Sequence, residues 1–247
     1  MRKALATLAA AVATATALAA PAAASGPAGF APTHARAGHV QAAPGRGFNI
    51  NGYNWGGYAA TGSGFTSVSA TWVQPSATCS HTTDLYAPWV GLDGYGSSTV
   101  EQTGVATDCS SGTAVNEPWY EMYPAAPVYL NTGTYPVSAG NTIHASVVYA
   151  GSNKFTLTLQ NVSRGWTFTT TKTLKSARRS SAEVIIESPP GKYPNFGTVS
   201  FSAATVNGAS LGSFGPVAMD PSANGVYEAH TGALSGGTAF SITYQHE

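Results

Sequence analysis

Apolar and polar residues alternate with a period of two along most of the chain after residue 47. In Thr142–Tyr149, for example, Ile143, Ala145, Val147 and Tyr149 fall on one side. Because successive side chains of a strand point to opposite faces, this pattern predicts a strand with one buried face. Similar patterns predict strands at Phe65–Val73, Leu85–Gly91, Thr99–Val105, Pro118–Tyr123, around Phe155–Leu159, and at Trp166–Thr173, Ser181–Glu187, Gly197–Ala203, Gly225–His230 and Ala239–Gln245.

Helical periodicity is almost absent, and glycine and proline separate the predicted strands. The 28 glycines, 15 prolines and 11% aromatic residues are typical of a turn-rich fold with large side chains to bury. Ten or so short strands of this kind indicate one all-β domain, a sandwich or jelly roll. No repeat of blade length is present, which argues against a propeller.

The N-terminal residues have the pattern of an export signal. Arg2 and Lys3 precede a long alanine-rich apolar run and a stretch of small residues, so residues 1–24 are predicted to be a signal peptide. A membrane anchor is the less favoured alternative, because the run is weakly apolar and a proline breaks it. Residues 25–47 resemble a flexible leader or short pro-segment, and the folded domain is expected at 48–247.

Charge is scarce, with 11 basic and 11 acidic residues, and four of the basic ones precede residue 47. The remaining chain is mildly acidic, which gives no reason to expect nucleic acid or an anionic membrane surface as a partner. An exported, extracellular protein with two cysteines most simply pairs them, so Cys79 and Cys109 are expected to form a disulfide. A monomer is expected.

Several common reaction centres are missing from the sequence. It has no G-x-S-x-G elbow, no H-E-x-x-H, no P-loop and no G-x-G-x-x-G. The histidines His81, His144 and His230 lack the spacing of metal ligands, so neither a metal nor a cofactor is expected.

Carboxylate chemistry remains, and Glu183 is the first candidate. It lies in the middle of Ser181–Glu187, a strand apolar enough to be central in a sheet, where a carboxylate is costly unless it is used or paired. The competing interpretation is that Glu183 and Glu187 lie on a solvent-exposed face of the strand and have no catalytic role. The two are four strand residues apart, about 13 Å, so both cannot address one scissile bond.

Gln102 is the second candidate, because it shares a side with Val100 and Gly104 in Thr99–Val105 and must face a core or a cleft. An amide can donate a hydrogen bond to a developing oxyanion, while a carboxylate can take a proton from water. Together the two groups would form a hydrolytic pair, although sequence alone does not show that they meet.

Four sequence blocks resemble, in order and spacing, the signature blocks of the glutamic peptidase (eqolisin) family. They are W-V-G-L-D-G at 89–94, V-E-Q-T-G-V at 100–105, W-Y-E-M-Y-P at 119–124 and S-A-E-V-I-I-E at 181–187. The resemblance extends from about Tyr53 to Tyr244 and suggests a bacterial-type member.

The resemblance implies a secreted acid endopeptidase on a concanavalin-A-like β-sandwich of two antiparallel sheets, acting on proteins or peptides. It implies that Glu183 is the general base and acid and that Gln102 stabilises the oxyanion. It further implies substrate contacts by four residues of the first and third blocks: Trp89, Asp93, Glu121 and Tyr123. Trp89 and Tyr123 could equally be core aromatics, and Asp93 could be part of a turn.

This chain departs from the fungal members at two positions of these blocks. Val184 and Met122 stand where those members commonly have tryptophan, so the substrate site is expected to be less aromatic. A carbohydrate-active sandwich, either a glycosidase or a non-catalytic carbohydrate-binding module, is the alternative function. A retaining glycosidase needs two carboxylates roughly 5 Å apart, whereas the most visible partner for Glu183 is an amide.

Overall fold

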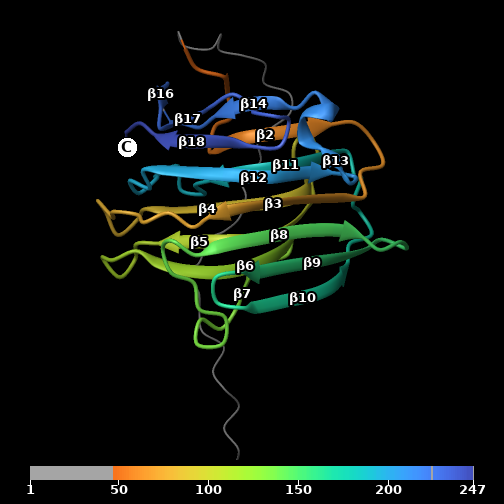
Figure 1. The fold of residues 1–247 in the computed structure, drawn as a ribbon, viewed down its shortest axis with the longest axis horizontal. Coiled ribbons are helices and arrows are strands. Elements are labelled where there is room, and N and C mark those ends of the chain that lie inside the picture. Colours follow the sequence, from red (N-terminus) through yellow and green to blue (C-terminus); the bar gives the residue numbers. More distant parts are fainter. Residues whose placement is uncertain (1–46, 224, 247) are drawn as a thin grey trace, which may run out of the picture.

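The computed structural model describes residues 47–223 and 225–246, and it consists of two large sheets packed face to face (Figure 1). Within these residues the one helical element is the short 3-10 turn η1 (Leu211–Phe214). The predicted all-β sandwich of two antiparallel sheets is confirmed, with a single short parallel pair at one edge, β1 with β14. The predicted signal peptide and nearly all of the predicted leader lie outside the described residues.

The first sheet, which we call sheet A, has eight strands. Their order is β1 (Ile50–Asn51), β14 (Val217–Asp220), β2 (Trp55–Thr61), β11 (Ser181–Glu187), β4 (Leu85–Asp93), β5 (Val100–Asp108), β6 (Val115–Tyr123) and β7 (Val128–Tyr129). Its central strands β11, β4 and β5 are buried along their whole length, on both faces.

Sheet B lies in front of sheet A in Figure 1 and follows the alternating pattern more closely. Its order is β10 (Trp166–Thr173), β9 (Lys154–Asn161), β8 (Thr142–Tyr149), β3 (Ser67–Val73), β12 (Thr198–Val206), β18 (Phe240–Tyr244) and β17 (Ala229–Thr231), with β13 (Ala209–Ser210) beside β12. A separate hairpin pairs β15 (Ser222–Ala223) with β16 (Val226–Tyr227).

The main hydrophobic core fills the space between the sheets. Sheet A contributes the even-numbered residues of β4 and β11 to this core, such as Val90, Leu92 and Val184. They pack against residues of sheet B such as Leu157 and Phe201. A second apolar cluster contains the odd-numbered residues of the same strands and no residue of a sheet B strand. This second cluster therefore marks the outer face of sheet A, turned away from sheet B.

Four strands of sheet A were not predicted from the sequence: the two-residue strands β1 and β7, β2 beside β11, and β14 beside β2. β2 contains Gly56 and Gly57, which interrupt the apolar pattern, and β14 has only four residues between Pro216 and Pro221. Gly57 has φ +128°, and a Cβ there would meet the carbonyl oxygen of Val184 at 2.4 Å, so the close approach of β2 to β11 requires glycine.

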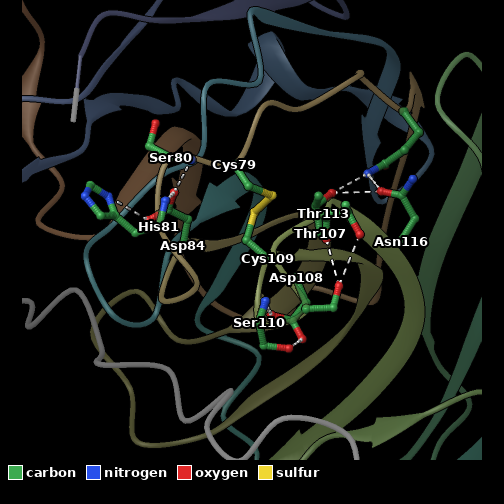
Figure 2. The surroundings of a disulfide bond; sticks show 12 residues. Cys79, Ser80, His81, Asp84, Thr107, Asp108, Cys109, Ser110, Thr113 and Asn116 are labelled. Carbon is green, nitrogen blue, oxygen red and sulfur yellow. Dashed lines mark hydrogen bonds and ion pairs between the residues drawn. A yellow bond between two sulfur atoms is a disulfide. The ribbon is translucent and has the colours of Figure 1, made fainter.

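The predicted disulfide is present, as Figure 2 shows. Cys79 and Cys109 are joined across a sequence separation of 30 residues, linking the loop before β4 to the end of β5. Closing a loop of that length is worth roughly 3–4 kcal/mol in the chain-entropy model. Asp84 supports the same corner, because its carboxylate accepts hydrogen bonds from the backbone N–H groups of Ser80 and His81 at 2.9 and 2.8 Å.

Candidate active site

The two residues expected to act together lie in one row across the outer face of sheet A. Glu183 on β11 is opposite Gly91 on β4, Gly91 is opposite Gln102 on β5, and Gln102 is opposite Glu121 on β6. Directly opposed residues of antiparallel strands project to the same face. Glu183 and Gln102 are thus two strand spacings apart, about 10 Å between Cα atoms, with no side chain at Gly91 between them.

Glycine at position 91 makes room for the indole of Trp89. A Cβ on Gly91 would lie 2.8 Å from Cζ3 of Trp89, closer than real Cβ atoms approach, and 3.2 Å from Cβ of Gln102, which is a tight contact. The edge of the Trp89 ring therefore covers the strand between Glu183 and Gln102. The same ring packs edge to face against Trp55, with centroids 5.0 Å apart, and both tryptophans are fully buried.

The amide of Gln102 is held by Glu121. Its Nε2 donates a 2.6 Å hydrogen bond to Oε2 of Glu121, and both side chains are buried. This bond fixes which way the amide points, while the second N–H of Nε2 and the oxygen Oε1 remain available; Oε1 has no hydrogen-bond partner among the described residues. Burial raises the pKa of Glu121 to about 8, and the Gln102 hydrogen bond opposes that rise.

Glu183 is fully buried and carries one weak hydrogen bond, from the backbone N–H of Tyr95 to Oε1 at 3.3 Å. Its other oxygen, Oε2, has no partner within the described part of the chain. Burial raises the pKa of Glu183 well above the usual glutamate value; the Ser181 hydroxyl and the Tyr95 backbone N–H oppose that rise, and the charges of Asp93 and Glu101 add to it slightly. The group is thus a stronger base, once ionised, than an exposed glutamate.

Asp93 lies at the end of β4, where its carboxylate is occupied by the chain that leads into β11. It accepts hydrogen bonds from the backbone N–H groups of Arg178, Arg179 and Ser180, all at 2.8 Å, and from the Ser180 hydroxyl at 2.9 Å. Asp93 is itself fully buried. These contacts make it an anchor that holds the start of β11 against the end of β4.

The other two predicted substrate-contact residues lie on the same outer face. Tyr123 is half-buried at the end of β6, opposite Val100, and packs against the outer apolar cluster. Trp89 is fully buried and lies between the row of Glu183 and the next row of the sheet.

Sequence reasoning missed the contact of Glu121 with Gln102 and the contribution of the Tyr95 backbone. A cross-strand hydrogen bond depends on strand register, which a strand pattern does not specify. The short separation of Gln102 and Glu121, on strands adjacent in the sequence, could still have indicated that the two residues pair. Within residues 47–223 and 225–246, no group of three His, Cys, Asp or Glu side chains is arranged to hold a metal ion.

Comparison with known proteins shows the family and the fold of the chain. Residues 53–244 match the model of the peptidase A4 family. The chain is 27% identical to scytalido-glutamic peptidase, solved with a peptide-based transition state analog, over 78% of this chain and 98% of that one, with a TM-score of 0.67. A search of curated proteins gives no match.

Two further solved structures are similar. SCP-B, a member of the eqolisin family of peptidases solved with a tripeptide, is 26% identical over 78% of this chain and 98% of that chain, with a TM-score of 0.63. Aspergilloglutamic peptidase from Aspergillus niger is 25% identical over 66% of this chain and 99% of that chain, with a TM-score of 0.57.

A two-sheet sandwich with a Glu, Gln and Glu row on one outer face, together with these matches, defines a hydrolase of the glutamic endopeptidase class. The chain belongs to the peptidase A4 family, the glutamic peptidases or eqolisins.

Proposed function

We propose that this protein is a secreted endopeptidase in which Glu183 and Gln102 form the catalytic dyad. The observation that carries the proposal is the row Glu183, Gly91, Gln102 on the outer face of sheet A, with one unpartnered oxygen on each of the two polar side chains. Glutamate and glutamine side chains on Cα atoms about 10 Å apart are long enough to act on one peptide carbonyl from opposite sides.

The reaction follows from the two groups. Ionised Glu183 takes a proton from water while the water oxygen attacks the carbonyl carbon of the scissile peptide bond. The carbonyl oxygen becomes an oxyanion, which accepts a hydrogen bond from the second N–H of Gln102. Glu183, now protonated, gives its proton to the leaving nitrogen as the C–N bond breaks, and returns to the carboxylate.

Glu121 has a positioning role in this scheme. Its hydrogen bond to Nε2 of Gln102 keeps the amide from turning over, so that the free N–H stays directed to one side of the row. Preorganised donors contribute to catalysis because they need no reorientation as charge develops. The direct substrate contact expected for Glu121 from the sequence stays a separate prediction.

The raised pKa of Glu183 bears on the working pH. Below that pKa the base is protonated and inactive. We therefore expect kcat/KM to fall on acidification with a midpoint above pH 4.5, the ordinary pKa of glutamate.

The carbohydrate-active alternative finds less support in the row. Glu183 and Glu121 are three strand spacings apart, about 14 Å, and Gln102 lies between them, whereas a retaining glycosidase needs carboxylates roughly 5 Å apart.

Incubation of the purified protein with denatured casein and, separately, with soluble glucans at pH 3 to 7 tests the proposal. We expect new peptides by mass spectrometry and no released sugar. Sugar release without peptide release would overturn the proposal in favour of a glycosidase. Binding of glucan with neither product would favour a carbohydrate-binding module.

A further inference from the structure

Acidic and basic side chains are distributed very differently between the interior and the surface. Among residues 47–223 and 225–246, nine of the ten acidic side chains are buried, and the tenth, Glu117, is half-buried. Of the seven basic side chains in the same ranges, six are exposed and Arg179 is half-buried. The exposed charge of the described residues is therefore positive, although their acidic residues outnumber their basic ones.

Burial also keeps several of the acidic groups neutral. It raises the pKa of Glu101 to about 9 and the pKa of Glu121 and Glu187 to about 8, and it raises the pKa of Glu183 well above the usual glutamate value. At pH 5 the protonated forms of these four glutamates predominate, so the seven basic groups face only the six remaining acidic ones. The mildly acidic balance read from the sequence thus does not describe the charge that a partner meets.

Five of the seven basic residues lie together at one corner of the sandwich, which we call the basic corner. They belong to the β9–β10 hairpin and to the connection from β10 to β11: Lys154, Lys172, Lys175, Arg178 and Arg179. Lys154 is opposite Thr173 at the end of the β9–β10 ladder. The backbone N–H of Leu174 donates a 2.9 Å hydrogen bond to the carbonyl oxygen of Asn153, in the turn after β8. Figure 1 shows this turn and the connection at the same end of the molecule, on the right.

Two cations of the basic corner lie over aromatic rings, and no carboxylate neutralises them. Cζ of Arg179 is 4.0 Å from the centroid of the Tyr149 ring on β8, and Nζ of Lys172 is 5.5 Å from that of Tyr120 on β6. Such contacts hold a cation in place and leave its charge intact. The nearby Asp93 is buried and accepts its hydrogen bonds from residues 178–180 through backbone N–H groups and the Ser180 hydroxyl. Within the described part of the chain, the ion pairs found join histidine to aspartate.

Hydroxyl groups adjoin the basic corner and continue from it along the outer face of sheet B. Thr173 is exposed opposite Lys154, and the next pair of the same ladder on this face, Thr171 with Thr156, has its hydroxyl oxygens 3.0 Å apart. Hydroxyl groups both donate and accept hydrogen bonds, as the hydroxyls of a sugar do. The rings of Tyr149 and Tyr120 are covered by the cations, so they do not offer the stacking platform that single-stranded nucleic acids use.

We propose that the basic corner binds an anionic polysaccharide, a polymer whose sugar units carry carboxylate or phosphate groups. The lysine and arginine side chains contact the charged substituents, and the threonine hydroxyls contact the sugar hydroxyls. The proposal goes beyond the peptidase function and does not depend on it, because none of its residues belongs to the row of the dyad. A secreted enzyme held in this way stays at a polysaccharide surface while it cleaves peptides.

Binding of fluorescently labelled dextrans at pH 5 and 50 mM salt tests the proposal. Dextran, carboxymethyl-dextran and dextran phosphate have the same backbone and differ in their charged groups. We expect at least one of the two anionic dextrans to bind and uncharged dextran not to bind. An increase to 500 mM salt should raise Kd at least about tenfold, because salt screens attraction between exposed charges.

A matched pair of double variants locates the binding. Lys154→Gln with Lys175→Gln removes two exposed cations of the basic corner and should raise Kd about tenfold. Arg164→Gln with Lys192→Gln also removes two exposed cations, but Arg164 is in the turn at the other end of the β9–β10 hairpin and Lys192 follows the far end of β11. This control should change Kd less than twofold. Thermal unfolding checks that both variants are folded, as expected for changes at exposed side chains.

The proposal is overturned if neither anionic dextran binds, if uncharged dextran binds as tightly as the charged ones, or if the two double variants raise Kd equally. Equal effects would mean that the protein responds to net charge and has no localised binding surface. Tighter binding of a thymine oligonucleotide than of either anionic dextran, compared at equal concentrations of charged groups, would reject the polysaccharide in favour of single-stranded nucleic acid.

Discussion

The outer faces of the two sheets differ in kind, although both sheets cover the same core. On sheet B, hydroxyl side chains of neighbouring strands meet at the surface, as in Thr156 with Thr171 and Ser200 with Ser241, which are 3.0 and 2.8 Å apart. On sheet A, the corresponding face carries tryptophan and buried glutamate and glutamine. The outer face of sheet B is solvated through hydroxyl groups although it has few charges. Sheet A instead buries polar groups, which destabilise a fold unless they are paired or serve a function.

The largest expected loss after Glu183 itself comes from Gln102. Gln102→Ala removes the proposed oxyanion donor, so kcat/KM should fall by about 10²–10³-fold, the usual effect of losing one such donor. Peptide cleavage and thermal unfolding are measured together. A loss under tenfold in a folded variant would contradict the assignment.

A smaller effect is expected at Glu121, which acts through Gln102. Glu121→Ala leaves the amide without its 2.6 Å acceptor and should lower kcat by about ten- to a hundredfold with little change in KM. Glu121→Gln keeps an acceptor oxygen and should recover part of the loss. Equal activity of the alanine and glutamine variants would show that the hydrogen bond to Gln102 is not what matters.

The buried glutamates of sheet A should also make the stability of the protein fall as pH rises. Burial raises the pKa of Glu121 and Glu187 to about 8 and that of Glu101, on the inter-sheet face, to about 9. Above about pH 4.5 the unfolded chain ionises these groups while the folded chain still holds their protons, so unfolding is favoured progressively up to pH 8–9.

Thermal unfolding between pH 5 and 8.5 measures this effect. We expect Tm to fall by more than about 5 °C across that range, since about 1 kcal/mol corresponds to 2–4 °C for a domain of this size. Glu101→Gln should flatten the slope. A Tm that is constant or rises with pH would mean that these carboxyl groups are not held neutral by the fold.

The smallest effect is expected on sheet B. Thr156→Val combined with Thr171→Val removes an exposed hydroxyl pair, and it should change the free energy of unfolding by less than about 1 kcal/mol. Peptide cleavage should stay within twofold of the unchanged protein. A large loss of activity would show that the two sheets are not divided in function as the comparison implies.

The strands of sheet B were predictable because one of their faces is wet, and alternation of the kind seen in Thr142–Tyr149 specifies it. The strands β2 and β14 were not predictable from the sequence. Gly56 and Gly57 interrupt the strand pattern of β2, prolines flank β14, and pairing with neighbouring strands determines the conformation of both.

In the site, Glu183 stood out from the sequence because it interrupts an apolar strand, and Gln102 because it shares a side of its strand with Val100 and Gly104. Their row across Gly91 depends on the register of three strands, which no local pattern contains. The carboxylate of Asp93 gave no sign in the sequence that it would hold the backbone of residues 178–180.

The most direct test of the dyad is the kcat/KM of Glu183→Gln on one peptide, measured beside the unchanged protein with the Tm of both. The substitution keeps the shape of the side chain and removes its ability to take a proton. We predict a loss of at least about 10⁴-fold, with Tm at pH 7 equal or higher because a buried ionisable group is gone. Activity within tenfold of the unchanged protein, in a variant with the same Tm, would contradict the account.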